Sequence, residues 1–437
     1  MEWRDRNMPV FEISQKSKEI RDKFFEQYVE FYKGGDVPEY ASSDFSYYLE
    51  CHRKRLEEKG ITAIKKVENI ADNIDSQVQK GNPPYTLNMT YKECNYETDY
   101  MKGDVLLARS DKETETLYCN ILDKQDYVEE TISCPNCGHS EGVRSFVNGC
   151  PMCGTRFKTF KFFPCVTSFH TLPKFVERNK INNHIRYTFI GAVILGIIVA
   201  FITGISTAVS SESILFGIFA GFFAGLGAGF IGWIMIYFTY SIFLAITTFS
   251  KMFAQAVDTT DLQAAQLTKK RLVNDMNRYF SDFSYEYFEG KLISLLRSII
   301  FSDDRENLSI LKCTENLDYM DDIIDVEYRG ASKYEGCTLV GDVLHVRMTA
   351  YVVCVVYKND KFSRHQVAFR MEVVTRLKKQ EDLGFSIHAV NCRTCGATFD
   401  AMHVDKCPHC GNPYNIIDDD WVVIYLQSSV NKQKEKT

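Results

Sequence analysis

The sequence predicts an α+β protein in which two cytosolic helix-plus-antiparallel-sheet domains flank a two-helix transmembrane hairpin. Three observations lead to this prediction. A nearly unbroken apolar run covers residues 187–249. Four CxxC pairs form two groups with similar spacing. The polar regions on both sides of the run share one order of helix, strands and cysteines, and helices set against an antiparallel sheet define the α+β class.

The apolar run is long enough for two membrane-spanning helices. A spanning helix needs about 20 apolar residues, and residues 187–209 and 214–240 each supply that length. Glu212 is the only charged residue inside the run, and it lies in a four-residue polar break at 210–213. Because four residues hold no domain, we expect a tight hairpin that returns the chain to its starting side. A buried hairpin in a soluble protein is the alternative, but soluble cores rarely need this length without polar breaks.

Basic residues on both sides of the run predict cytoplasmic flanks. We interpret residues 173–186 as a basic juxtamembrane segment, and Lys251 and the run 269–271 follow the hairpin. Short cytoplasmic flanks collect Lys and Arg, so we expect a two-pass protein of the cell membrane with both termini in the cytoplasm. The first six residues hold no apolar segment, so we expect no cleaved signal peptide.

The composition limits the compartment and the partners. The 437 residues carry a formal net charge of −6, and neither half holds a strongly basic stretch. Phosphate binding needs concentrated Lys and Arg, so nucleic acid is not expected as a partner. Fifteen cysteines, an odd number, argue against a closed disulfide set and fit a reducing compartment better. Acidic clusters at 303–304, 321–322 and 418–420 are interpreted as solvated turns.

The two cysteine groups predict two structural zinc ions, each in a zinc ribbon. Each CxxC pair makes a tight turn that aims two thiolates at one point, and the glycine after the pair permits that turn. Four thiolates suit tetrahedral zinc and leave no open position for a catalytic water. A redox function of the pairs is the rival interpretation, but it does not explain the similar spacing. The expected ligands are Cys134, Cys137, Cys150 and Cys153 in one ribbon, and Cys392, Cys395, Cys407 and Cys410 in the other.

A common layout in the two polar regions predicts an internal repeat. Asp-Phe-Ser-Tyr occurs at 44–47 and at 282–285, each time with a stretch of helical apolar spacing. Strand-like segments, a cysteine group and an apolar closing strand follow in both regions. We expect domains at 1–172 and 250–437, with ribbons at 134–153 and 392–410. The expected strands are 85–91, 104–108, 116–121, 128–132, 343–357 and 366–378, with closing strands at 157–171 and 421–427.

The C-terminal half combines a ribbon with a last strand that begins at a tryptophan. The relevant residues are Asp282-Phe-Ser with its helix, the strand pair, Asn391-Cys-Arg-Thr-Cys-Gly-Ala-Thr-Phe-Asp400, Cys407-Pro-His-Cys410-Gly and Trp421-Val-Val. In this combination the half resembles bacterial members of the Tim-forty-four-like family, named for the tether of the mitochondrial import motor. The resemblance implies the nuclear-transport-factor-two-like, or cystatin-like, α+β fold.

The same resemblance implies tethering or docking at a membrane, and not catalysis, although a fold does not fix a function. The N-terminal half departs from the family pattern, because Phe160 to Phe163 stand where Trp421 would be. We interpret that half as a diverged second Tim-forty-four-like copy.

These observations predict a membrane-anchored zinc-ribbon scaffold or docking protein whose partners are the lipid bilayer and a protein or peptide. No nucleophile elbow, P-loop, HExxH or glycine-rich dinucleotide turn occurs, so we do not expect an enzyme. An enzyme with an unrecognised pocket stays open as an alternative. A glycine-zipper channel or transporter component is another, although no intramembrane charge marks an ion path.

Small residues at four-residue spacing predict close packing of the two membrane helices. One ridge of the second helix consists of Gly217, Gly221, Gly225 and Gly229, and an adjoining ridge consists of Ala220, Ala224, Ala228 and Gly232. The first helix carries a third ridge, formed by Gly196, Ala200, Gly204 and Ala208. We expect one ridge of the second helix to meet the first helix. The other ridge leaves a homo-oligomer as a further alternative.

Overall fold

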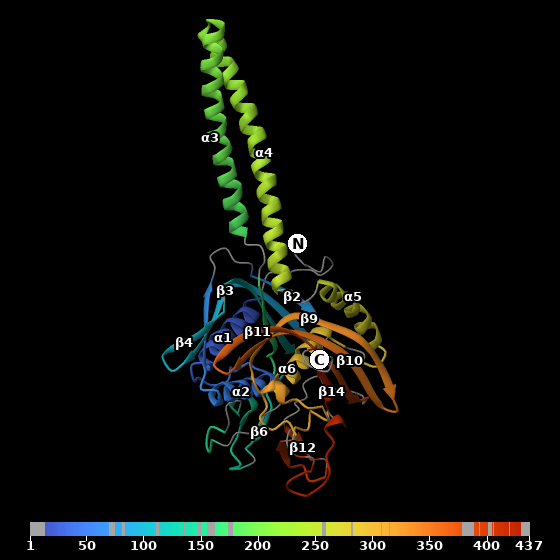
Figure 1. Cartoon of the computed structure of the whole chain (residues 1–437). Coiled ribbons are helices and arrows are strands. Elements are labelled where there is room, and N and C mark those ends of the chain that lie inside the picture. The colour runs from blue at the N-terminus through green and yellow to red at the C-terminus, as the bar shows by residue number, and fades with distance from the viewer. Residues whose placement is uncertain are drawn as a thin grey trace. The chain divides into compact units, whose positions relative to one another are not determined.

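A computed structural model of the chain shows two compact units, which are described separately (Figure 1). Met1–Pro173 and Thr260–Thr437 together form an α+β unit, and Lys174–Thr259 form a hairpin unit. The structure describes residues 14–429 except 70–74, 81–83, 111–112, 135, 147–149, 155–161, 174–177, 256–258, 281–282, 307, 314, 378–388, 393, 401–403, 405 and 419.

The first half of the α+β unit contains two helices and a six-stranded antiparallel sheet. The main strand order is β1-β3-β5-β8, and β2 and β4 also pair with the long strand β3. Both helices begin at a serine whose side chain accepts a backbone N–H bond from the first turn, Ser14 from Ser17 and Ser42 from Phe45. The elements are α1 (Gln15–Phe31), α2 (Ser43–Glu58), β1 (Thr62–Asn69), β2 (Asp75–Lys80), β3 (Tyr85–Lys102), β4 (Val105–Arg109), β5 (Glu113–Lys124), β6 (Thr131–Ser133), β7 (Ser140–Gly142) and β8 (Cys165–Pro173).

The second half contains a four-stranded antiparallel sheet in the order β14-β11-β10-β9. Helix α6 is buried along almost its whole length and shares one apolar core with β10, β11 and β14. Strands β10 and β11 meet at Asn359 and Asp360, which both have positive φ as a tight two-residue hairpin turn requires. The elements are α5 (Thr259–Met276), α6 (Tyr285–Phe301), β9 (Ile323–Val340), β10 (Val343–Lys358), β11 (Lys361–Arg376), β12 (Ala389–Asn391), β13 (Thr398–Asp400) and β14 (Val422–Ser428).

The two halves repeat one order of elements. Each has a helix followed by an antiparallel path of four strands, β1-β3-β5-β8 or β9-β10-β11-β14, with a two-stranded insertion that carries a cysteine group before the last strand. The first half adds α1 and the strands β2 and β4. The insertions are β6–β7 and β12–β13. The α+β class with antiparallel sheets is therefore confirmed. The Asp-Phe-Ser-Tyr motifs are not equivalent, because residues 44–47 lie inside α2 whereas Ser284 caps the start of α6. Asp282 lies outside the described residues.

The cores of the two halves are continuous. Tyr47 belongs to the apolar cluster of the second half, and Ile324 and Val355 belong to that of the first. Gly290 of α6 allows a close approach to β8, since a Cβ atom there would lie 2.8 Å from the Cβ of Ser168. Each half therefore contributes one large antiparallel sheet, as the sequence predicts, but helices α2 and α6 of the two halves pack together inside one unit.

Several strands differ from the expected ones. Helix α1 and strands β1, β2 and β9 were not predicted, and β3 is longer than the expected strand 85–91. The expected strand 128–132 is reduced to the short ribbon strand β6. The expected closing strand 157–171 begins only at Cys165, and residues 157–161 lie outside the described part of the chain.

The hairpin unit consists of two long helices, α3 (Arg178–Ser211) and α4 (Ile214–Gln255), that run side by side (Figure 1). Within them, Arg186–Ser211 and Ile214–Ile242 are long and apolar enough to cross a membrane. Most of their large apolar side chains are exposed, as expected for helices that face lipid. Glu212 has a φ of 51° in the turn that joins them.

The glycine ridge of α4 packs against α3. A Cβ atom on Gly221 would lie 2.5 Å from the backbone oxygen of Ala200, and one on Gly217 would lie 2.6 Å from the Cβ of Ala208. Gly227, in contrast, has no such neighbour within 4 Å. One ridge of the second helix thus meets the first helix, as the sequence predicts, and a homo-oligomer stays a prediction.

Candidate metal centres

The four CxxC pairs adopt one backbone turn. In the first pair, the N–H of Cys134 donates to the carbonyl oxygen of His139, and the N–H of Gly138 donates to that of Cys134. Gly138 has a φ of 73°, which favours glycine because a Cβ atom is strained in the left-handed region. The glycines after the other three pairs have the same conformation: Gly154, Gly396 and Gly411.

These turns bring all eight cysteines together in two groups of four. The Sγ atoms of Cys134 and Cys153 are 3.6 Å apart, and those of Cys137 and Cys150 are also 3.6 Å apart. In the second group the corresponding distances are 3.6 Å for Cys392 with Cys410 and 3.7 Å for Cys395 with Cys407. Within each group all four sulfurs lie within 4.8 Å of one another. Both pairs of a group thus contribute sulfurs to one compact set, as a shared ion requires.

The donor set fits a metal ion better than disulfides. A disulfide has an S–S length of about 2 Å, and all fifteen cysteines are free thiols. The first cysteine of each pair is buried and the second is exposed, so each group lies at the surface with one side covered. Cys134 and Cys150 pack with Phe146 in a small core of their own. His139 bonds to Glu141 instead of joining the group.

The remaining buried cysteines are unreactive. Burial raises the pKa of Cys94, Cys119, Cys165 and Cys354 to about 12. A thiol with such a pKa stays protonated at neutral pH and is a poor nucleophile. These side chains therefore serve as small core residues.

A buried polar cluster at the junction of the two halves was not predicted. The hydroxyl of Tyr100 donates to Asp325 at 2.8 Å, and the ammonium of Lys65 lies 3.8 Å from the same carboxylate. Burial opposes ionisation of Asp325, but Lys65 and His52 outweigh it and lower the pKa to about 2. Burial lowers the pKa of His52 to about 4. His52 lies 2.7 Å from the carbonyl oxygen of Ile324, so this cluster joins α2 to the second half.

A second buried cluster corrects one interpretation of the sequence. Asp420 was expected in a solvated turn, yet it is only 4% exposed. Its carboxylate lies 2.6 Å from the ammonium of Lys291 on α6, and the carboxylate of Asp44 on α2 lies 3.3 Å from the same nitrogen. Two carboxylates from different halves therefore share one cation.

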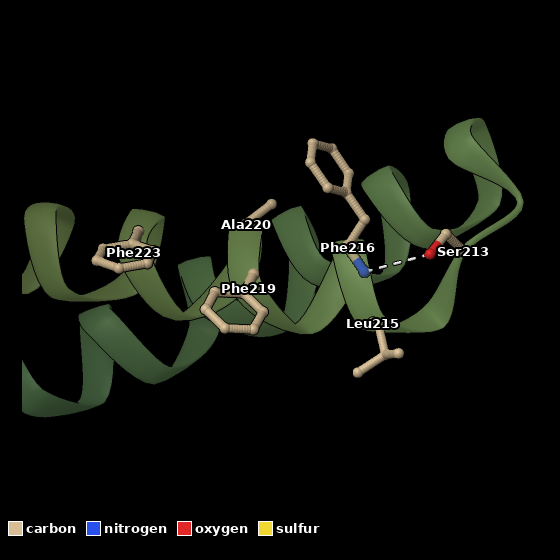
Figure 2. A pocket seen from close by; sticks show the side chains of 6 residues that line it. All are labelled: Ser213, Leu215, Phe216, Phe219, Ala220 and Phe223. Atoms are coloured by element: carbon tan, nitrogen blue, oxygen red, sulfur yellow. Dashed lines mark hydrogen bonds between the residues drawn. The ribbon is translucent and has the colours of Figure 1, made fainter.

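A shallow apolar groove lies on the hairpin unit beside the turn (Figure 2). It has a volume of about 560 Å³, and all of its lining comes from Ser213 and α4. The only polar side chain there is that of Ser213, whose hydroxyl accepts from the N–H of Phe216 at 3.4 Å. Figure 2 shows the rings of Phe216, Phe219 and Phe223 along the helix. The groove can accommodate an apolar group, but its lining residues provide no acid, base or charged nucleophile.

Comparisons with protein-family models, with curated proteins and with solved structures find no match to this chain.

Proposed function

We propose that this chain is a membrane-anchored scaffold or docking protein that binds a protein or peptide partner at the cytoplasmic face of the cell membrane. One observation supports this most: the segments before and after the hairpin build a single α+β unit. Segments that share a core must fold in one compartment, so the chain must cross the membrane an even number of times. A two-pass hairpin with both termini in the cytoplasm meets that requirement and agrees with the basic flanks.

In this proposal both cysteine groups hold structural Zn²⁺. Zinc–thiolate bonds of about 2.3 Å place tetrahedral ligands about 3.8 Å apart, close to the observed separations of 3.6–3.7 Å. Four protein ligands close the coordination sphere, so the ions stabilise the ribbons and do not activate water. The cytoplasm, which keeps thiols reduced, suits these groups.

The resemblance to the Tim-forty-four-like family supports docking as the activity. The second half combines α6, a four-stranded antiparallel sheet and a cysteine group ahead of Trp421, in the order on which that resemblance rests. The α+β unit would provide the binding surface and the hairpin would hold it at the bilayer.

Site-specific photo-crosslinking in native membranes tests this function. A photoreactive residue is placed at Val128 or at Val340, which are 82% and 61% exposed on the α+β unit. The matched control carries it at Phe230, which is 62% exposed on the hairpin. We expect a discrete protein adduct from at least one position on the α+β unit and only lipid adducts from Phe230.

Two other outcomes would favour the rival classes. A protein adduct from Phe230 alone would favour a component of a channel or transporter. Turnover of a defined substrate by the purified chain, without any protein adduct, would favour an enzyme.

A further inference from the structure

At the junction of the two halves, the buried ammonium of Lys291 lies between the carboxylates of Asp44 and Asp420. The side chains of Lys291 and Asp420 are 7% and 3% exposed, and that of Asp44 is 14% exposed. The three come from three elements: α6, the segment that leads into β14, and the first turn of α2. One ammonium balances one carboxylate, so the cluster carries an excess negative charge when both are ionised. Burying such a charge is costly, and uptake of a proton removes the cost.

The positions of the two carboxylates decide which of them binds the proton. Asp44 lies in the first turn of α2, where the exposed N–H groups of the helix stabilise an anion. Asp420 is more deeply buried, and burial raises its pKa to about 7 although Lys291 opposes the rise. Its second carboxylate oxygen accepts the N–H of Trp421 at 2.6 Å, at the start of the last strand. Its own N–H donates to Ile416, in the segment after the second cysteine group.

Three other described titratable groups at the cluster have pKa values raised above their usual ranges, Tyr287, Cys165 and Lys291. Burial raises the pKa of Tyr287 on α6, which lies near all three charged groups. Burial likewise raises the pKa of Cys165 on β8 to about 12, although Arg144 acts in the opposite direction. Asp420 and Asp44 raise the pKa of Lys291 above its usual range despite its burial.

We propose that Asp44, Lys291 and Asp420 form a proton-binding switch that tightens the junction of the two halves and the start of β14 as the pH falls. The proton moves between bulk water and a carboxylate oxygen of Asp420, and no other bond forms or breaks. With the proton bound, Lys291 pairs with Asp44 alone and the cluster is neutral. When the proton leaves, two anions compete for Lys291, and the contact between α2, α6 and β14 weakens. The switch depends neither on the partner nor on the membrane crossing.

The sign of the pH dependence follows from the raised pKa. Between the pKa of an unfolded aspartate and that of Asp420, the folded state binds more protons, so stability falls as pH rises. From pH 6 to pH 8 the unfolding equilibrium constant should increase about tenfold through this group. Histidines titrate in the same range, so the comparison must be made between variants.

Unfolding of the full chain in nanodiscs, with excess zinc and at pH 6, 7 and 8, tests the switch. From pH 6 to pH 8, the unfolding equilibrium constant of the wild type should rise about tenfold more than that of Asp420→Asn. Asp44→Asn leaves Lys291 to Asp420 alone and should move the transition to lower pH. Asp104→Asn, at an exposed turn outside the junction, should keep the wild-type profile.

Infrared absorption of the folded protein gives a second readout that does not depend on unfolding. The wild type at pH 6 should show a protonated-carboxyl band that fades by pH 8 and is missing in Asp420→Asn. Parallel stability profiles for the wild type and Asp420→Asn, or the absence of such a band at pH 6, would overturn the proposal.

Discussion

At the scale of single residues, the unit depends on polar side chains buried where the two halves meet. His52 bonds to Tyr32 at 2.7 Å and stacks on Phe301 of the other half, with ring centroids 4.5 Å apart. The guanidinium of Arg55 donates to the carbonyl oxygens of Met320 and Asp321. A defect in the junction that removed the acceptor of His52 at Ile324 or those of Arg55 would leave a buried polar group unsatisfied, which costs about 1–3 kcal/mol. The contact between the two halves therefore depends on individual polar pairs as well as on apolar packing.

His52 should make the fold sensitive to acid. Its folded pKa of about 4 lies below the unfolded value of about 6.5. The stability it contributes is fully present above the unfolded pKa and is lost as pH falls toward the folded one. Between pH 7.5 and pH 5, wild type should lose about 2 kcal/mol of stability relative to His52→Gln. Denaturant unfolding at both pH values measures this difference. Equal changes in the two proteins would contradict it.

At the scale of elements, the cysteine groups and the hairpin were predictable because their signals are local. A CxxC pair with its glycine specifies its own turn, and an apolar run specifies a membrane helix by length alone. Strands β1 and β9 lacked such signals. Lys65 lies inside β1 next to Lys66, and two adjacent lysines are typical of a solvated segment, yet Lys65 is buried against Asp325 from the other half of the chain. Its burial could not be inferred without knowing which segments meet.

Removing one ribbon's ligands should remove one metal ion. Replacing Cys134 and Cys137 by serine should lower the zinc content from two equivalents per chain to one. Hydrogen exchange should quicken in β6 and β7 but not in β10, because Cys134 and Cys150 pack in a small core of their own. Elemental analysis and hydrogen exchange measure the two effects. As a control, Cys313→Ser should keep both ions. Less than one equivalent in the wild type, or iron in place of zinc, would refute the assignment.

The hairpin should tolerate bulk on one face of α4 only. Gly221→Ala places a methyl group within 2.5 Å of the backbone oxygen of Ala200, whereas Gly227→Ala meets nothing within 4 Å. We expect the first change to cost about 1–3 kcal/mol through overpacking and the second to be nearly neutral. Hydrogen exchange of α3 amides in micelles reports the loosening. Similar exchange in both variants would show that the helices do not pack through this face.

At the scale of the whole molecule, the order of elements was predictable but their joining was not. The sequence predicts two similar halves separated by a hairpin, and each half does contain its own antiparallel sheet. Helices α2 and α6 pack on each other, Gly290 of α6 approaches β8, and Arg55 of α2 donates to the carbonyl oxygen of Met320. The local sequence around these residues does not show whether their side chains contact the other half or their own half of the chain. Pairing between distant segments depends on shape and charge that only the folded chain brings together.

The proposed topology gives a direct expectation for accessibility. A cysteine at Ser211, which lies at the exposed turn of the hairpin, should react with a membrane-impermeant thiol reagent in intact cells. A cysteine at Arg278, whose side chain is 72% exposed on the α+β unit, should react only after permeabilisation. The native cysteines should behave like the second. Labelling of the Arg278 position from outside would overturn the hairpin topology.

The position of the hairpin within the chain has a consequence for biosynthesis. Ribosomes add about 5–20 residues per second, so α6 is completed roughly 6–26 s after the first half ends at Pro173. During that interval α2 has no α6 to cover it, and His52 and Arg55 lack their acceptors. We expect the nascent first half to wait at the membrane as an incomplete fold, available to chaperones, until translation delivers the second half.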